Sequence, residues 1–560
     1  MVSRRHTTKG LLALAAILLL TGIFAAPTHA AQTSADASGH AQARTTSVNP
    51  DHIAVLAAAL KNMRDNYAKF ANFTPGPQDI LDYNIGNLWL NGIDGTGATV
   101  AVIEGWDDPG IAAFIHVRDL RYGLPDPVIQ TIYPSGPLPA QCPPGMVVLG
   151  SYGSCDAWVG ELRLDVLAVH LIAPYAKIVI SATPADSEIT DDAASNVAPP
   201  EMMHALEYIS ANHIANAISI SDGTGEITYS FGKAQIHAND PGPLAAAAAG
   251  IPVLNATGDC GVVQNLAVAN AQCGNTSAGP DTATWDDNPW VTAVGGTVPN
   301  VSKTDGSKLG PDPLWHVGGT FGEGAGFSSV YPRPSYQDGV ARITQSRWRS
   351  VPDITMDSQS GTSEAAPLMA GVLALATQLN DGRNVGPINP ALYQLLGRRG
   401  QNAGISDVVS GNNSVIDLNT GKVLVQGFTA GPGFDVASGW GTIDASKFVP
   451  ALVDATRALA GDFFIRRAAS EELRRLEHSI RLSAQGRPAG GTTDVSDGGF
   501  LPGHPVRLAI DGKPVTTLTA SDAGTVSYTL DPAALGLSPG HHVLTLQSML
   551  ITTTAAFGSR

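Results

Sequence analysis

Short apolar runs and helical segments alternate along the middle of the chain. The runs are rich in valine, isoleucine and alanine, have the length of buried strands and end in polar or glycine-rich turns. We expect strands at 98–104, 176–181, 217–221, 251–255 and 290–295, and helices at 159–172, 199–212 and 242–250. This alternation predicts an α/β fold in which helices cover both faces of a parallel sheet.

Three polar or glycine-rich loops follow predicted strands, at 105–110, 222–225 and 257–261. In a parallel sheet such loops meet at one edge, and ligands bind beyond the carboxyl ends of the strands. The pattern therefore predicts a functional site at this edge, within an α/β domain that we expect to span residues 73–450.

The N-terminus has the pattern of a secretory signal peptide. Basic residues precede an apolar run at 11–20, and small residues around Ala30 provide a cleavage site. We therefore expect a signal peptide at 1–30 and a secreted protein. The next segment, 31–72, is predicted to be flexible at first and helical over 50–70. No later run is long and apolar enough to span a bilayer, so we expect no integral membrane segment after signal removal.

The chain changes character again near residue 450. Residues 451–483 have helical character and 486–499 form a glycine-, serine- and threonine-rich linker, so we place a connector at 451–499. Period-two alternation then predicts strands at 506–510, 515–518, 525–530, 542–546 and 551–557. This pattern is typical of a small antiparallel β-sandwich, here at 500–560.

Composition narrows the classes of function. The formal net charge of −16 argues against nucleic-acid binding and gives some support for an acidic working environment. Export favours disulfides for the four cysteines, which allow three connectivities. Pairing Cys142 with Cys155 and Cys260 with Cys273 is the simplest, because each pair closes a short loop. A zinc site is the alternative, but the cysteines lack C-x-x-C spacing and clustered histidines.

Ser363 lies in a small-residue turn that leads into an apolar helical run at 368–376. Near the first turn of a helix, backbone N–H groups are free and the helix dipole favours negative charge. A serine there can act as a nucleophile with an anion site beside it. The alternative is an ordinary helix start that a serine or threonine caps.

Three acidic residues extend this chemistry. Glu161 and Asp165 are four residues apart in a predicted helix, so their carboxyl groups share one face. Such a pair can share a proton, and one member can accept the proton of a serine hydroxyl. Asp259 follows a buried strand, and in its protonated form it could donate a hydrogen bond to an oxyanion. The alternatives are a solvated helix face and an aspartate in an ordinary turn.

Five motifs occur in the order found in one peptidase family. They are GELRLD at 160–165, APYAKI at 173–178, GDCG at 258–261, VGGT at 294–297 and SGTS at 360–363 followed by Pro367. In this the chain resembles the sedolisins, the serine-carboxyl peptidases with a subtilisin-like fold, over roughly 73–450. The sandwich at 500–560 is similar to bacterial immunoglobulin-like modules, which could bind a cell-surface ligand or act as a spacer.

The resemblance implies roles for individual residues. The nucleophile, the general base, the partner that orients the base and the oxyanion donor would be Ser363, Glu161, Asp165 and Asp259, respectively. The loop at 219–225 would line the substrate groove through Ser219, Ser221 and Gly223.

The resemblance also implies one Ca²⁺ site near the end of the domain. Carboxylates would come from Asp407 and Asp435, and backbone oxygens from Val408, Gly431 and Gly433. Hard oxygen ligands of this mix suit Ca²⁺. Without the resemblance, Asx turns in a glycine-rich loop would explain the same residues.

The chain departs from the usual sedolisin pattern at four places. The segment 31–72 is much shorter than the family's propeptide, which argues against activation by propeptide removal. The approach to Ser360 is short, which indicates a trimmed substrate loop. Glu364 follows the nucleophile where a small apolar residue is usual, and Asp222 stands where the groove loop usually has an aromatic residue.

Taken together, the residues predict a secreted, monomeric endopeptidase that cuts proteins or peptides at acidic pH through an acyl-enzyme on Ser363. Two alternatives stay open. An ordinary Asp-His-Ser subtilisin would use Asp107 or Asp108, although His170 stands in an apolar helical run. A non-catalytic exported protein would keep the fold as a scaffold and bind a partner through its C-terminal sandwich.

Overall fold

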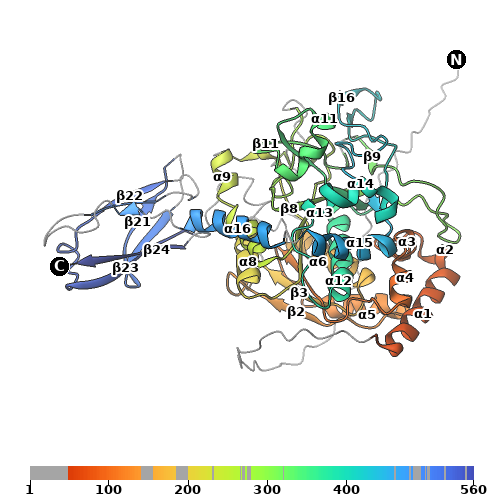
Figure 1. Ribbon diagram of the computed structural model, residues 1–560, viewed down its shortest axis with the longest axis horizontal. Coiled ribbons are helices and arrows are strands. Elements are labelled where there is room, and N and C mark those ends of the chain that lie inside the picture. Colours follow the sequence, from red (N-terminus) through yellow and green to blue (C-terminus); the bar gives the residue numbers. More distant parts are fainter. Residues whose placement is uncertain are drawn as a thin grey trace, which may run out of the picture. The chain divides into compact units, whose positions relative to one another are not determined.

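A seven-stranded sheet forms the centre of the α/β part of the computed structural model (Figure 1). Its order is β13-β8-β5-β4-β1-β3-β2, and all neighbouring strands are parallel. The strands are β1 (Thr99–Glu104), β2 (Ile129–Ile132), β3 (Lys177–Ala182), β4 (Ala217–Ile220), β5 (Val253–Ala256), β8 (Val291–Thr297) and β13 (Ile354–Asp357). The predicted parallel sheet is confirmed, and β2 and β13 extend it at its two edges.

The structure describes most of the chain beyond the N-terminal region. The described residues are 48–140, 155–183, 200–229, 232–264, 266–267, 272–273, 279–319, 321–459, 462–477, 481–482, 493–497, 500, 505–521, 525–548 and 552–559. The predicted signal peptide at 1–30 lies outside them.

Helices cover both faces of the sheet, as the alternation predicted. They include α5 (Ile111–Tyr122), α6 (Cys155–Ile172), α8 (Pro200–Ala211), α10 (Pro241–Ala249) and α12 (Thr362–Leu379). Successive side chains of a strand point to opposite faces, and β1 divides its residues between two cores. Val100 and Val102 pack in the core that contains residues of α6 and α12, whereas Ala101 and Ile103 pack in the core with residues of α8 and α10.

Helix α12 begins with the serine turn and is almost entirely buried. Gly371 permits close packing on α6, because a Cβ atom there would lie 2.7 Å from Cβ of Ile172. Pro367 lies inside the helix and has no N–H, so the carbonyl of Ser363 lacks its usual helical partner. The hydroxyl of Ser221 donates to this carbonyl at 3.2 Å. The start of α12 is thereby tied to the loop that follows β4.

The helix expected over 50–70 is divided into two. Asn66 leaves the helical conformation, with φ −114° and ψ 15°, between α1 (Pro50–Asp65) and α2 (Tyr67–Phe70). The predicted apolar face of α1 is buried in the main core through Leu56, Leu60 and Met63. Two short helices follow, α3 (Pro77–Asp82) and α4 (Ile85–Leu90).

The single helix expected over 451–483 is wrong. The structure has α15 (Ala445–Ala458) and α16 (Asp462–Glu477), and Gly461, a poor helix former, lies in the sequence between them. Arg481–Leu482 forms the strand β18 instead. It pairs with β19 (Thr493–Asp497), which lies within the stretch expected to be linker. The pairing of β18 with β19 therefore overrides the helical pattern at 481–482 and the linker pattern at 493–497.

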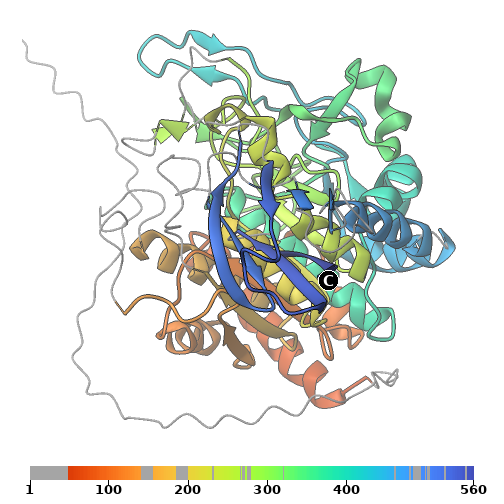
Figure 2. The same ribbon diagram turned by 90° about the vertical axis from the view of Figure 1, so that its left-hand side faces the viewer.

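The C-terminal region forms two antiparallel sheets around a core of its own. One sheet has the order β18-β19-β22 and the other β21-β20-β23-β24. The remaining strands are β20 (Pro505–Ile510), β21 (Lys513–Thr519), β22 (Val526–Leu530), β23 (Gly540–Gln547) and β24 (Thr552–Ser559), seen at the blue end of the chain in Figure 2. All five expected strands are present.

None of the helices in the described part of the chain has the length and apolar character needed to cross a membrane.

A buried ion pair fixes the approach to the serine turn. Arg349, in β12 (Trp348–Val351), donates to both carboxylate oxygens of Asp353, at 3.0 and 2.8 Å, and both side chains are fully buried. Arg349 also donates to three backbone carbonyls, and the hydroxyl of Tyr393 donates to Asp353 at 2.9 Å. Because Asp353 immediately precedes β13, this network positions the strand that leads to Ser363.

We predict that Arg349→Met lowers the free energy of unfolding by about 3–5 kcal/mol, since it leaves the Asp353 carboxylate buried without a counter-charge. Urea unfolding measures the loss. The control is Arg383→Met, which breaks an exposed pair with Asp381 and should cost less than about 1 kcal/mol. Similar small losses in both variants would contradict this account of the pair.

Candidate active site

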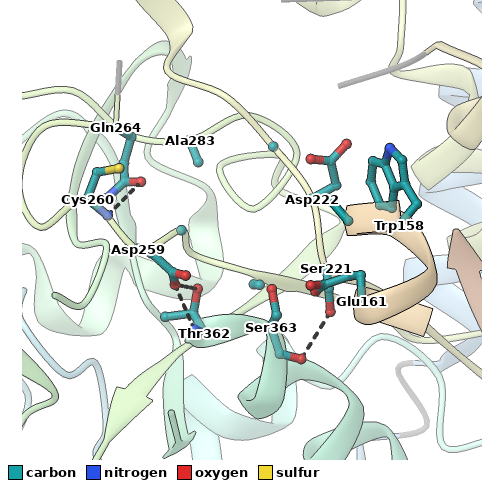
Figure 3. Close-up of a pocket in the computed structure, with 14 residues that line it drawn as sticks. Trp158, Glu161, Ser221, Asp222, Asp259, Cys260, Gln264, Ala283, Thr362 and Ser363 are labelled. Atoms are coloured by element: carbon teal, nitrogen blue, oxygen red, sulfur yellow. Dashed lines mark hydrogen bonds between the residues drawn. The ribbon is translucent and has the colours of Figure 1, made fainter. Parts of the chain in front are cut away.

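A pocket lies at the carboxyl edge of the sheet, where the sequence predicted a site. It forms between α6, the start of α12 and the loops that follow β4 and β5 (Figure 3). The lining residues are Ala157, Trp158, Glu161, Ser221, Asp222, Gly223, Ala256, Gly258, Asp259, Cys260, Gln264, Ala283, Thr362 and Ser363. The fold therefore brings three of the four expected catalytic residues to one cavity, and Asp165 lies one turn further along α6.

Ser363 is half-buried in the first turn of α12 and faces the pocket. The residue that precedes the helix, Gly361, has φ +93°, which L side chains rarely adopt. A Cβ atom there would also lie 2.6 Å from Oδ2 of Asp259. Glycine is therefore required for the turn to place Ser363 beside Asp259.

Glu161 and Asp165 lie on α6, across the pocket from the serine turn. Burial raises the pKa of Glu161 to about 7, although a hydrogen bond with the side chain of Ser363 lowers it. Burial and the charge of Glu161 raise the pKa of Asp165 well above its usual range. Oγ of Ser221 lies 3.1 and 2.9 Å from the two Asp165 oxygens, within hydrogen-bond distance. The two carboxyls therefore interact as a pair, and one of them reaches the serine.

Asp259 lies on the other side of the serine turn. The backbone N–H and the hydroxyl of Thr362 donate to its Oδ1, at 2.7 and 2.9 Å. Burial raises the pKa of Asp259, although these two bonds lower it. The next residue, Cys260, forms a disulfide with Cys273, with a Cα–Cα distance of 4.9 Å, as the sequence predicted. Asp259 thus combines a fixed position with a tendency to hold its proton.

The other predicted disulfide involves a residue outside the described ranges. Cys155 is disulfide-bonded, and Cys142 is not described. The pairing of Cys142 with Cys155 therefore stays a prediction.

Sequence reasoning missed Glu104 at the end of β1. Its side chain is fully buried, and neither carboxyl oxygen has a hydrogen-bond partner among the described residues. Burial raises its pKa well above the usual range, and the charges of Asp165, Glu161 and Asp222 raise it further. A carboxyl at the end of a buried strand was the available signal. Glu104 is thus a fourth acid in a group with Glu161, Asp165 and Asp222.

The expected substrate loop lies partly in the pocket. Ser221 and Gly223 line it, as does Asp222, whereas Ser219 is buried within β4 and is not a lining residue. The end of β4 at Ile220 explains the difference, because Ser219 lies before the point where the chain leaves the sheet and Ser221 lies after it. Trp158, Gln264 and Ala283 also line the pocket and carried no signal in the sequence.

Glu364 points away from the serine into a second group of acids. Its Oε2 accepts the N–H of Ser360 at 2.8 Å, and Asp79 of α3 and Asp357 of β13 lie beside it. One carboxyl oxygen of each residue lies within 4.8 Å of the others, and all three side chains are buried. We call Asp79, Asp357 and Glu364 the buried triad. It joins α3 to the serine turn.

Burial raises the pKa of every member of the buried triad. The pKa of Asp357 rises to about 6, although hydrogen bonds with Asp79 and Gln359 lower it. The pKa values of Asp79 and Glu364 rise well above the usual range, through burial and then through the charge of Asp357. Protons held within the group therefore stabilise it, and ionisation of all three carboxyls would cause repulsion in a medium of low dielectric constant.

An Asp-His-Ser arrangement is not present at these residues. His170 is fully buried in α6, and its Nε2 lies 2.9 Å from Oδ1 of Asp119. Asp108 accepts a hydrogen bond from Arg163 at 2.7 Å, and Asp107 accepts one from Tyr133 at 2.6 Å. None of these three residues lines the pocket around Ser363. The alternative of an ordinary subtilisin triad is therefore wrong.

The predicted calcium ligands lie close together. The N–H of Gly433 donates to Oδ2 of Asp407, and the N–H of Gly431 donates to Oδ2 of Asp435, both at 2.8 Å. Oδ1 of Asp407 is buried and has no hydrogen-bond partner among the described residues. Both halves of the expected site thus meet, and an unsatisfied carboxylate oxygen is compatible with a cation there.

Comparisons with known proteins agree with this geometry. The profile of the subtilase family matches residues 162–395. Kumamolisin of Bacillus sp. (strain MN-32) is 28% identical over 412 residues, which are 69% of this chain and 65% of that protein. Tripeptidyl-peptidase 1 of Homo sapiens is 31% identical over 198 residues, 30% of this chain and 32% of that protein. Pseudomonas sedolisin, a serine-carboxyl proteinase solved with pseudo-iodotyrostatin, superimposes with a TM-score of 0.52 and 21% identity, covering 64% of this chain and 94% of that chain.

The fold is that of the subtilisin-like class. The profile and the relatives make the chain similar to the sedolisin family of serine peptidases, as the motifs predicted. The structural neighbour confirms the predicted fold. The chain spans 65% of kumamolisin and about a third of tripeptidyl-peptidase 1. The immunoglobulin-like character of the C-terminal sandwich stays a prediction.

The buried triad gives a prediction about pH. Its raised pKa values mean that the folded state keeps protons that the unfolded state releases above about pH 4. Stability therefore falls as the pH rises from about 4. The contribution of Asp357 is lost as the pH passes its pKa of about 6, and the contributions of Asp79 and Glu364 are lost at their own raised pKa values. In Glu364→Gln this fall should be shallower by up to about 1.4 kcal/mol per pH unit, which urea unfolding at several pH values measures.

The control for this experiment is Glu472→Gln, which changes an exposed glutamate and should leave the pH slope unchanged. If Glu364→Gln and the parent protein lose stability with the same slope, the triad does not hold the protons assigned to it.

Proposed function

We propose that this protein is a secreted serine-carboxyl endopeptidase that hydrolyses peptide bonds at weakly acidic pH. The observation that carries the proposal is that the side chains of Ser363, at the start of α12, and Glu161, on the facing helix, line one pocket, where the Ser363 side chain lowers the pKa of Glu161. A nucleophile and a base within hydrogen-bond reach, with the base itself paired to Asp165, have the arrangement that acyl transfer requires.

In the proposed reaction, Oγ of Ser363 attacks the peptide carbonyl carbon while its proton passes to Glu161. The negative charge that develops on the carbonyl oxygen accepts a hydrogen bond from protonated Asp259. Glu161 then gives its proton to the leaving amine, and the acyl-enzyme forms. Water attacks the ester through the same steps in reverse, with Glu161 again accepting and returning a proton.

Asp165 and Ser221 act on the position and protonation of Glu161. Oγ of Ser221 lies within hydrogen-bond distance of both Asp165 oxygens and of the backbone carbonyl of Ser363, and its single proton can be shared among them. The hydroxyl of Ser221 therefore connects Asp165, the proposed partner of the base, with Ser363, the proposed nucleophile. This connection fixes the separation of the two helices across the pocket, where small displacements would reduce the rate.

We predict a bell-shaped dependence of kcat/KM on pH, because Glu161 must be ionised and Asp259 protonated. The peak should lie between the raised pKa of Asp259 and the value of about 7 for Glu161. Asp259→Asn keeps a hydrogen-bond donor that does not titrate. Its activity should be lower than that of the parent, and the fall on the alkaline side should disappear.

Ser363→Ala and Glu161→Gln should each lower kcat/KM on an unfolded protein substrate by at least about 10³-fold. Parental activity in either variant would overturn the proposed roles. A folded parent that cleaves no substrate at any pH would instead favour the non-catalytic scaffold.

We further propose that Asp407, Asp435 and the backbone oxygens of Val408, Gly431 and Gly433 hold Ca²⁺. The bound ion would supply positive charge to two carboxylates and brace the loop at 431–435 against the sheet β14 (Ile405–Ser406) with β17 (Thr442–Ile443). The proposed Ca²⁺ ion stabilises the fold and takes no part in the reaction.

Removal of Ca²⁺ by a chelator should lower the melting temperature of the parent by a few degrees, since the ion binds only the folded state. Asp435→Asn should have a lower melting temperature before the chelator is added and should change little when it is added. Asp305→Asn, an exposed control, should respond like the parent. A parent that does not respond would contradict the site.

A further inference from the structure

The pocket beside Ser363 is acidic, and one of its carboxyls has no part in the proposed catalysis. Glu161, Asp222 and Asp259 line it, and the other lining residues in the described part of the chain include no lysine, arginine or histidine. Glu161 interacts with Ser363, and Asp259 accepts two hydrogen bonds from Thr362. Asp222 is therefore the carboxyl that remains available to a ligand.

Asp222 lies just after β4, where the chain leaves the sheet, and its side chain is half-buried. Its Oδ2 has no hydrogen-bond partner among the described residues. Burial raises the pKa of Asp222 well above the usual range, and the charge of Glu161 raises it further, although a bond from the N–H of Gly223 lowers it. A cation in the pocket would remove the cost of ionising this carboxyl.

Trp158 gives this side of the pocket an apolar wall. Asp222 and Trp158 lie together, across the pocket from Gln264 and Ala283 (Figure 3). The indole packs on Gly105, where a Cβ atom would lie 2.3 Å from the ring, so the ring has little freedom to move away. An aromatic ring next to a carboxyl group suits a cation that is carried on an aliphatic stem.

We propose that Asp222 and Trp158 form a subsite for a cationic group of the substrate, an ammonium or a guanidinium group. This subsite rests on the proposed peptidase function and adds a substrate class to it. The cation is the side chain of a lysine or arginine near the scissile bond, or the free N-terminus of a short peptide. Both offer N–H donors to Asp222, and the experiment separates them.

The test uses fluorogenic peptides that carry lysine or norleucine, in turn, at each position on the N-terminal side of the scissile bond. Norleucine keeps the aliphatic stem and lacks the charge. Each peptide is made with a free and with an acetylated N-terminus. At one position, or for the free terminus, the parent should show kcat/KM at least about 10-fold higher for the cationic form.

Asp222→Asn keeps the shape of the side chain and removes its charge, and in this variant the ratio should fall to about 1. Asp305→Asn changes the net charge by the same amount at an exposed site and should keep the parental ratio. A ratio near 1 in the parent for every pair, or a preference that Asp222→Asn leaves intact, would overturn the subsite.

Binding of the same peptides to Ser363→Ala, followed by fluorescence anisotropy, tests the subsite without catalysis. A 10-fold tighter binding of the cationic peptide that Asp222→Asn abolishes in the Ser363→Ala background would support it even if the parent cleaved nothing. In that case the peptidase assignment alone would fail. Equal binding of both peptides would overturn the subsite, whatever the activity.

Discussion

The burial of carboxyl groups is the constraint on which the rest of this structure depends. Glu104, Glu161 and Asp165 lie near one another at the carboxyl edge of the sheet, and the buried triad lies behind the serine turn. Moving a carboxylate out of water without a counter-ion is costly, so these groups keep their protons to a higher pH than exposed acids do. Burial disfavours the charged form of these carboxyls and so raises their pKa values, for Glu161 to about 7. Acid–base chemistry requires carboxyls with pKa values raised in this way.

The backbone around Ser363 shows how few features are needed to hold such a site. Gly361 permits the turn, and Pro367 frees the carbonyl of Ser363, which accepts the hydroxyl of Ser221. Ser221 also donates to Asp165, so the loop after β4 contacts both helices of the proposed catalytic group. In the core, Gly371 lets α12 approach α6 closely. The distance between Ser363 and Glu161 is therefore set by packing of the two helices, which is stiff because protein interiors are densely packed.

Two acidic residues that depart from the usual sedolisin pattern have separate places in the structure. Glu364 adjoins the nucleophile in sequence, but its side chain turns back to the N–H of Ser360 and to Asp79, so it adds to the buried triad and does not line the pocket. Asp222 does line the pocket and lies across it from Asp259. The first bears on stability and the second on ligand selection, and neither occupies the space where Ser363 and Glu161 meet. Both are thus compatible with an active peptidase.

The sequence by itself determined the alternation of strands and helices, the parallel sheet with two covered faces, and the family to which the motifs belong. These features are local, because periodicity and the order of short motifs are properties of consecutive residues. It also marked Ser363, Glu161, Asp165 and Asp259 as chemically suitable. Only the tertiary structure decided that Ser219 does not line the pocket, that His170 is paired with Asp119, and that 481–482 and 493–497 are strands. Each of these depends on a partner far away in the chain, and local patterns carry no information about such a partner.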